Sequence, residues 1–118
     1  MANHHILGAT GEALAAKWLA AKGFVLLHRN WRYAHCEVDI IASCKNVLHF
    51  IEVKTRRNKK FGLPEESVNN KKIQNLLKAG AAFQDQYPQW KRVQYDVMSI
   101  TILPDGKAEY FFIEDVYF

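Results

Sequence analysis

Apolar residues recur at two different spacings along the chain, and each spacing predicts one kind of element. Residues 8–22 are rich in alanine, and the larger apolar side chains Leu14, Trp18 and Leu19 recur at helical spacing. Gly23 follows at the position where a glycine commonly ends a helix. The pattern predicts a first helix over 8–22, whose small residues allow a close approach to a sheet.

A second helix is predicted over 67–87. Its apolar residues repeat every three or four positions, and they are Ile73, Leu76, Leu77 and Phe83. Asn69 is a suitable N-cap, and Pro88 closes the segment. The lysines Lys71, Lys72 and Lys78 fall mostly on its polar face. They either keep the helix soluble or contact phosphate.

Five segments have the apolar and β-branched composition of strands. They are 24–33, the two halves of a hairpin over 36–55, 91–103 and 108–118, with a turn at 104–106. The hairpin strands are apolar on both faces, so each face needs a covering layer. The order of elements predicts a mixed sheet flanked by helices, in a single domain over 1–118.

The hairpin over 36–55 carries the residues on which the functional prediction depends. Strand side chains alternate between faces, so Glu52 and Lys54 project from the same side. With a two-residue loop at 45–46, Asp39 lies directly opposite Glu52, with Cβ atoms about 5 Å apart. Two such carboxylates repel unless Lys54 and a divalent cation lie between them. The alternative is a structural salt bridge between Lys54 and either acid.

Glu12 belongs to the first turn of the first predicted helix, on the stripe that holds Ala15, Ala16 and Leu19. On that stripe it would look inward rather than into water. In a first turn it would equally complement the helix dipole. The sequence leaves both interpretations open.

Basic residues flank the hairpin on both sides. Arg29, Trp31 and Arg32 end the first strand, where they are suited either to stack on nucleic acid or, for Trp31, to pack in the core. Arg56, Arg57, Lys59 and Lys60 follow the second hairpin strand. This run is predicted to be a loop too charged to pack, serving either as a solvated surface or as a phosphate-binding arm.

Composition narrows the function classes. The 118 residues carry a formal net charge of +4, which weakly favours a polyanionic partner. Cys36 and Cys44 form no CxxC pair, which indicates reduced thiols and a cytoplasmic location. No apolar run approaches the roughly 20 residues of a membrane span, and no signal pattern begins the chain. The five histidines lack zinc-ligand spacing, and no phosphate-binding glycine loop is present.

Asp39, a twelve-residue gap and Glu52-Val53-Lys54, in this order of elements, resemble the PD-(D/E)XK nuclease superfamily. More closely, the chain resembles the small bacterial YraN-like family, which is similar to archaeal Holliday-junction resolvases. The matching positions are Gly11-Glu12, Arg29-Asn30-Trp31-Arg32, 37–42, 50–56, Phe61-Gly62 and Lys72. Cys36 stands where the family usually has glycine, and Gln94 where it usually has arginine.

The resemblance implies an α/β (α+β) fold with a restriction-endonuclease-like αβββαβ core. It also implies a divalent-metal-dependent endonuclease that hydrolyses DNA phosphodiesters, with branched DNA as a candidate substrate. Asp39 and Glu52 would bind Mg²⁺ or Mn²⁺, with the Val53 carbonyl as a further ligand and Glu12 reaching the metal from the first helix. Lys54 would orient or deprotonate the attacking water. Nucleic-acid contacts are expected at Arg32, Arg56, Arg57, Lys59, Lys60 and Lys72.

Two alternatives and three secondary expectations complete the prediction. The chain could be a non-catalytic nucleic-acid-binding module of the same fold, or a protein-interaction domain that uses its aromatic last strand. Asp96 is expected to anchor a local hydrogen bond rather than a metal, and Glu37 to act as an acid behind Asp39. A homodimer would suit a symmetric DNA junction.

Overall fold

A computed structural model describes the backbone of residues 2–57 and 70–116, and the side chains of residues 10–57 and 71–116. The elements follow one another as α1 (Ala2–Ala21), β1 (Val25–Tyr33), β2 (Cys36–Cys44), β3 (Val47–Arg56), α2 (Asn70–Gln86), β4 (Val93–Ile102) and β5 (Ala108–Ile113). This order of one helix, three strands, a second helix and two strands is the predicted one.

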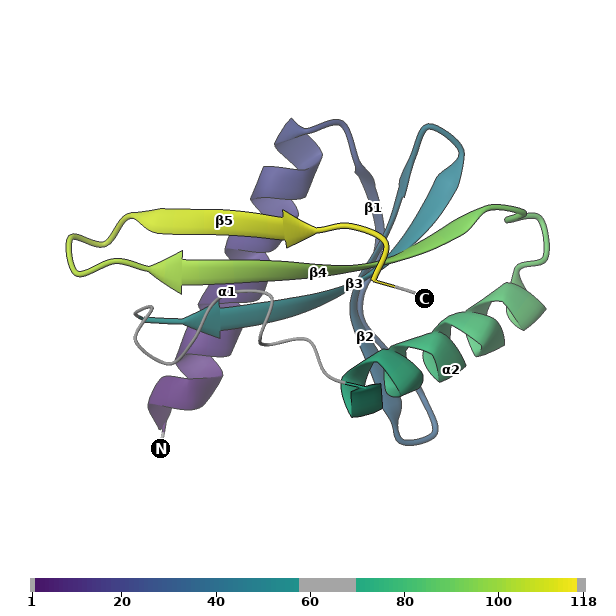
Figure 1. Ribbon diagram of the computed structural model, residues 1–118, viewed down its shortest axis with the longest axis horizontal. Coiled ribbons are helices and arrows are strands. Elements are labelled where there is room, and N and C mark those ends of the chain that lie inside the picture. Colours follow the sequence, from purple (N-terminus) through teal and green to yellow (C-terminus); the bar gives the residue numbers. More distant parts are fainter. Residues whose placement is uncertain (1, 58–69, 117–118) are drawn as a thin grey trace.

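The five strands form one mixed sheet in the order β1-β2-β3-β4-β5. Neighbouring strands are antiparallel except β3 and β4, which run parallel. A parallel pair needs a crossover, and the chain between these two strands contains α2 (Figure 1). The α+β class and the restriction-endonuclease-like arrangement of strands and helices are therefore confirmed.

Each helix covers one face of the sheet. Ala15 and Leu19 of α1 pack on Ile40 and Ile51, whereas Phe83 of α2 belongs to the cluster on the opposite face. The Phe83 ring lies at the centre of aromatic contacts, with centroids 5.3 to 5.7 Å from the rings of Trp31, Phe50 and His28. Of the two interpretations of Trp31, packing in the core is the one observed.

The β2–β3 hairpin has the predicted two-residue turn. Cys44 pairs with Val47 across it. Lys45 and Asn46 between them adopt φ values of 51° and 65°. Positive φ at both central positions gives the turn a twist that matches the strands on either side. The register that brings Asp39 and Glu52 together follows from this turn.

The first helix begins earlier than predicted, at Ala2 rather than Gly8. A single glycine costs only about 1 kcal/mol in a helix interior, so Gly8 does not begin a new element. Glu12 consequently lies in the middle of α1 and not in its first turn, which removes the helix-dipole interpretation. Gly23, with φ of 96°, follows the end of the helix as predicted.

The other boundaries move by a few residues. The second helix begins at Asn70 rather than at residue 67, and the predicted N-cap Asn69 lies outside the described residues.

Cys36 and Cys44 carry free thiols. Within the part of the chain that the structure describes, no helix has the length and apolar character that a membrane span requires.

Candidate nuclease-like site

The candidate site lies where the β2–β3 ladder ends. Ile40 opposite Ile51 is the last regular pair, and Asp39 and Glu52 are the next residues along the two strands. Asp39 Oδ2 accepts a hydrogen bond of 2.7 Å from the backbone N–H of Val53. The carboxylate thereby takes the place of a backbone acceptor, and it is held firmly against β3.

Asp39 is surrounded by other acids. Burial raises the pKa of its carboxyl group to about 7, although the hydrogen bond from Val53 opposes this. The negative charges of Glu12, Glu52 and Glu37 raise the pKa of Asp39 further. A nearby cation would favour the ionised form of such a carboxyl group. The surroundings of Asp39 are therefore electrostatically suited to a cation.

Glu52 and Lys54 project towards α2. They have the same strand parity as Phe50, which packs in the α2 cluster, while Ile51 packs in the α1 cluster. Burial raises the pKa of Glu52, and the positive charges of Lys72 and Lys54 oppose that rise. The predicted placement of the acid and the lysine on one side is therefore observed, and Lys72 of α2 joins them.

Lys72 lies close enough to these groups to be strongly affected by them. Burial lowers the pKa of its ammonium group, and a hydrogen bond with the Lys54 side chain lowers it further. The carboxylates of Glu52 and Asp39 act in the opposite direction. Asp39, Glu52, Lys54 and Lys72 are called the acid–lysine cluster from here on.

Glu12 approaches the cluster from the α1 side. Its side chain is 22% exposed, and its Oε1 atom lies 4.0 Å from Arg29 Nη2. Its charge still raises the pKa of Asp39. The inward interpretation of Glu12 is thus the observed one, with Arg29 as a weak ion-pair partner at the edge of the site.

Glu37 and Arg32 pair with each other. Arg32 Nε donates a hydrogen bond of 2.9 Å to Glu37 Oε2. The pair lies on the exposed side of β1 and β2, and 77% of the Arg32 side chain is accessible to solvent. Arg32 can therefore reach a phosphate only by leaving Glu37 or by sharing its guanidinium between the two.

The basic run after β3 differs in part from the prediction. Arg56 is the last residue of β3, half-buried, and its Nε donates a hydrogen bond of 3.4 Å to Thr101 Oγ1. The expectation that the run is too charged to pack is wrong for this residue, because the strand continues through it. Arg57 is exposed. Lys59 and Lys60 lie outside the described residues.

One buried polar pair was not predicted from the sequence. His49 Nδ1 and Asp96 Oδ2 are 2.7 Å apart, and both side chains are almost fully buried. Asp96 Oδ1 also accepts hydrogen bonds from Gln94 Nε2 at 2.9 Å and from the backbone N–H of Asp115 at 2.8 Å. Asp96 therefore anchors hydrogen bonds, as expected. The contact between Asp96 and His49 depends on the parallel β3–β4 register, and the sequence has no tight turn that would fix this register.

The donors available to a metal ion are few. Among the described residues, no three His, Cys, Asp or Glu side chains are grouped so that they could hold a metal ion by themselves. Asp39 and Glu52 offer two carboxylates, and the Val53 carbonyl is a further oxygen at the same end of the ladder. This set suits a hard cation that keeps several of its own waters, such as Mg²⁺.

Comparison with other proteins shows which family the chain is similar to. The sequence model of UPF0102, an uncharacterised protein family, matches residues 11–100. A UPF0102 protein of Phocaeicola vulgatus is 37% identical over 116 residues, which are 98% of this chain and 93% of that protein. A UPF0102 protein of Rhodococcus jostii is 43% identical over 103 residues, 86% of this chain and 87% of its own. The chain belongs to the UPF0102 family.

Membership in UPF0102 confirms the resemblance to the YraN-like family. The residues that match the UPF0102 model include Glu12 and the whole acid–lysine cluster, but not β5. The description of UPF0102 states no activity. Its function has to be inferred from the site.

Proposed function

We propose that this protein is a divalent-metal-dependent endonuclease that hydrolyses phosphodiester bonds in DNA, with branched DNA as its substrate. The observation that carries the proposal is the acid–lysine cluster. A structural salt bridge would account for Glu52 beside Lys54 and Lys72. It does not account for Asp39, which is half-buried among three other carboxylates that raise its pKa.

Asp39 and Glu52 would hold the metal, with the Val53 carbonyl as a third protein ligand. The bound Mg²⁺ or Mn²⁺ would lower the pKa of a coordinated water and offset charge on the phosphoryl oxygens. The hydrogen bond from Val53 N–H to Asp39 Oδ2 fixes the orientation of the carboxylate and leaves Oδ1 as the available ligand atom.

The two lysines have complementary roles. Both lie beside Glu52 and can contact a phosphate that approaches the cluster. Burial and a hydrogen bond with Lys54 lower the pKa of Lys72, because a hydrogen bond between two lysine side chains requires one of them to be a neutral amine. Lys72 is therefore neutral more often than an isolated lysine, and a neutral amine can accept a proton from the attacking water. Lys54 is the one that the PD-(D/E)XK resemblance assigns to this task.

DNA in the cytoplasm is the substrate that fits this chemistry. Arg57 is exposed just beyond the cluster at the end of β3, where it can contact a neighbouring phosphate. Two copies of the chain would present two clusters to the two-fold symmetry of a four-way junction. The proposal therefore includes a homodimer on the DNA.

The test is a cleavage assay of the purified protein. Duplex, single-stranded, flap and four-way-junction DNA are incubated with Mg²⁺ or Mn²⁺. Cleavage is expected on a branched substrate and only with metal. Asp39→Ala and Lys54→Ala are each expected to lower the rate at least a hundredfold while binding of the DNA largely survives, because they remove a metal ligand and a water-orienting amine.

The matched control is Asp105→Ala. Asp105 is an exposed acid in the β4–β5 turn, and its carboxylate accepts a hydrogen bond from the nearby Lys107 N–H. This variant is expected to cleave at the wild-type rate. Salt-sensitive DNA binding without cleavage under either metal would contradict the proposed enzyme and favour a non-catalytic DNA-binding module. Absence of both binding and cleavage would favour a protein-interaction domain.

A further inference from the structure

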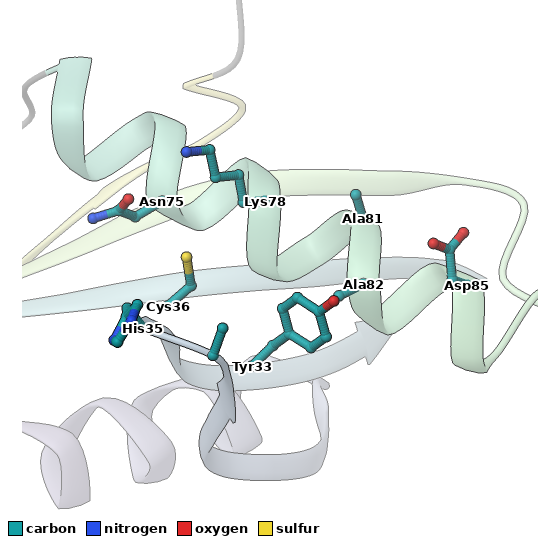
Figure 2. Close-up of a pocket in the computed structure, with 9 residues that line it drawn as sticks. Tyr33, His35, Cys36, Asn75, Lys78, Ala81, Ala82 and Asp85 are labelled. Carbon is teal, nitrogen blue, oxygen red and sulfur yellow. The ribbon is translucent and has the colours of Figure 1, made fainter.

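A pocket of about 550 Å³ lies between the β1–β2 turn and α2 (Figure 2). On one side are Tyr33, whose side chain is half exposed, and His35 in the turn itself. On the other side are Asn75, Ala82 and Asp85 of α2. Its volume falls within the range of roughly 300 to 1,000 Å³ that is typical of ligand sites.

A second pocket of about 350 Å³ lies at the same turn. Both pockets are lined by His35, and the second is also lined by Arg32 and Glu37. The Arg32 side chain is thus close to the turn that lines the first pocket.

Two elements, β2 and α2, connect the first pocket to the acid–lysine cluster. On β2, Cys36 in the pocket precedes Asp39 by three residues, which is about 10 Å of strand. On α2, Asn75 follows Lys72 by one turn, and Lys78 follows by another, which places Lys78 about 9 Å along the helix. In a stacked strand this distance corresponds to about two or three nucleotides.

The lining has the groups that a nucleobase requires. The exposed Tyr33 ring offers an aromatic face for stacking, and Ala82 leaves room opposite it without adding polarity. Asn75 can donate and accept hydrogen bonds, and Asp85 can accept them at the edge of a base. Lys78 at the pocket wall is suited to the phosphate of the same nucleotide.

We infer that this pocket binds an unpaired nucleobase of the DNA substrate, a few nucleotides from the phosphate held by the acid–lysine cluster. The inference rests on the proposed function and narrows its substrate to DNA in which a single-stranded segment adjoins a duplex. A fully paired duplex keeps its bases stacked inside the helix, so it cannot fill the pocket without the cost of unstacking a base. The unpaired base then determines which phosphate reaches the cluster.

The test measures binding without cleavage. Metal-free protein is titrated into a duplex with a single-stranded flap that carries one 2-aminopurine, a base whose fluorescence falls when it stacks. A fully paired duplex of equal length serves as reference. The wild-type protein is expected to bind the flap about tenfold more tightly than the duplex and to quench its fluorescence, since one base–aromatic stack corresponds to about 5- to 150-fold in affinity.

Two variants of Tyr33 and one of Phe111 test whether the Tyr33 ring itself causes the flap preference and the quenching. Tyr33→Leu is expected to abolish the preference and the quenching, whereas Tyr33→Phe keeps both. Phe111 is an exposed aromatic residue on β5, at the opposite edge of the sheet; it is 43% exposed, and Tyr33 is 51% exposed. Phe111→Leu is expected to keep both. The inference is overturned if Tyr33→Leu retains the preference, or if Phe111→Leu loses it as well.

The outcomes also distinguish this inference from the proposed activity. Flap preference that depends on Tyr33, in a protein that cleaves nothing with either metal, contradicts the nuclease and supports the pocket. Cleavage that does not discriminate between flap and duplex, with no effect of Tyr33→Leu, contradicts the pocket alone. A protein that binds neither DNA overturns both.

Discussion

Ionisation of Asp39 is opposed by the fold, because burial and three neighbouring carboxylates raise the pKa of its carboxyl group from 3.8 to about 7. Between these two pH values the folded chain binds more protons at this site than the unfolded chain does. The free energy of unfolding therefore decreases as the pH rises from about 4 to about 7, and the loss is complete above that range. Asp39 thus lowers stability at neutral and alkaline pH in the absence of a cation.

Asp39→Asn is accordingly expected to raise the free energy of unfolding by about 2 kcal/mol at pH 8. An asparagine can still accept the hydrogen bond from Val53 N–H, and it carries no charge. Below about pH 3 the carboxyl group is neutral in both states, so the gain should vanish there. The measurement is urea unfolding with EDTA at several pH values. Asp105→Asn, at an exposed turn, serves as the control, and a pH-independent loss of stability in Asp39→Asn would contradict the assignment.

The sequence could predict part of the site at this scale. Asp39, Glu52 and Lys54 are linked by one hairpin, so strand parity and a two-residue turn suffice to bring them together. The helical pattern named Lys72 as one of three lysines, and only the resemblance singled it out, because its interaction with Glu52 depends on where α2 crosses the sheet. The His49–Asp96 pair was missed for a related reason, since a parallel register has no turn to fix it.

At the scale of elements, Gly11 determines how closely α1 lies on β3. A methyl group at this position would overlap the Thr55 hydroxyl group. The close approach places the next residue, Glu12, near Asp39. The glycine thus has a positional role that its helix propensity would not suggest.

Gly11→Ala is expected to lower the free energy of unfolding by about 1–2 kcal/mol. Overpacking costs about 1–3 kcal/mol, and the better helix propensity of alanine offsets up to about 1 kcal/mol of it. Thr55→Ala removes the overlapping hydroxyl group, so it should make Gly11→Ala less costly in the double variant than alone. Thermal unfolding of the four proteins completes the cycle. An additive result would contradict the contact between α1 and β3.

Element boundaries were less predictable than element order. The prediction of the hairpin was accurate because the two-residue turn allows one register, and in that register apolar side chains face both helices. The start of α1 was wrong because no strong stop signal separates residues 2–7 from the rest of the helix, and Gly8 alone does not interrupt it. The basic run was misjudged at Arg56, where β3 continues and Thr101 accepts a hydrogen bond.

At the scale of the whole molecule, the fold class was predictable because the central strands are apolar on both faces. Such strands require a layer on each side, and the two helices are the segments able to supply one each. The surface pockets were not predictable. The pocket beside Tyr33 exists only because α2 returns across β2 next to the β1–β2 turn, which joins residues 33–36 to 75–85.

The last prediction concerns the salt dependence of DNA binding. The formal charge of +4 strengthens that binding only through cationic side chains that lie near the phosphates. Arg57 is exposed beyond the end of β3, on the side of the acid–lysine cluster. Arg57→Gln is expected to weaken binding of every DNA and to reduce by about 1 the slope of log K against log salt concentration. Fluorescence anisotropy across a salt series measures both. Lys45→Gln removes the same charge at the β2–β3 turn, at the opposite end of β3, and should leave the slope unchanged. Equal slopes for the two variants would contradict a DNA path past the acid–lysine cluster. An effect of net charge alone would be the same for a charge removed at either end of β3.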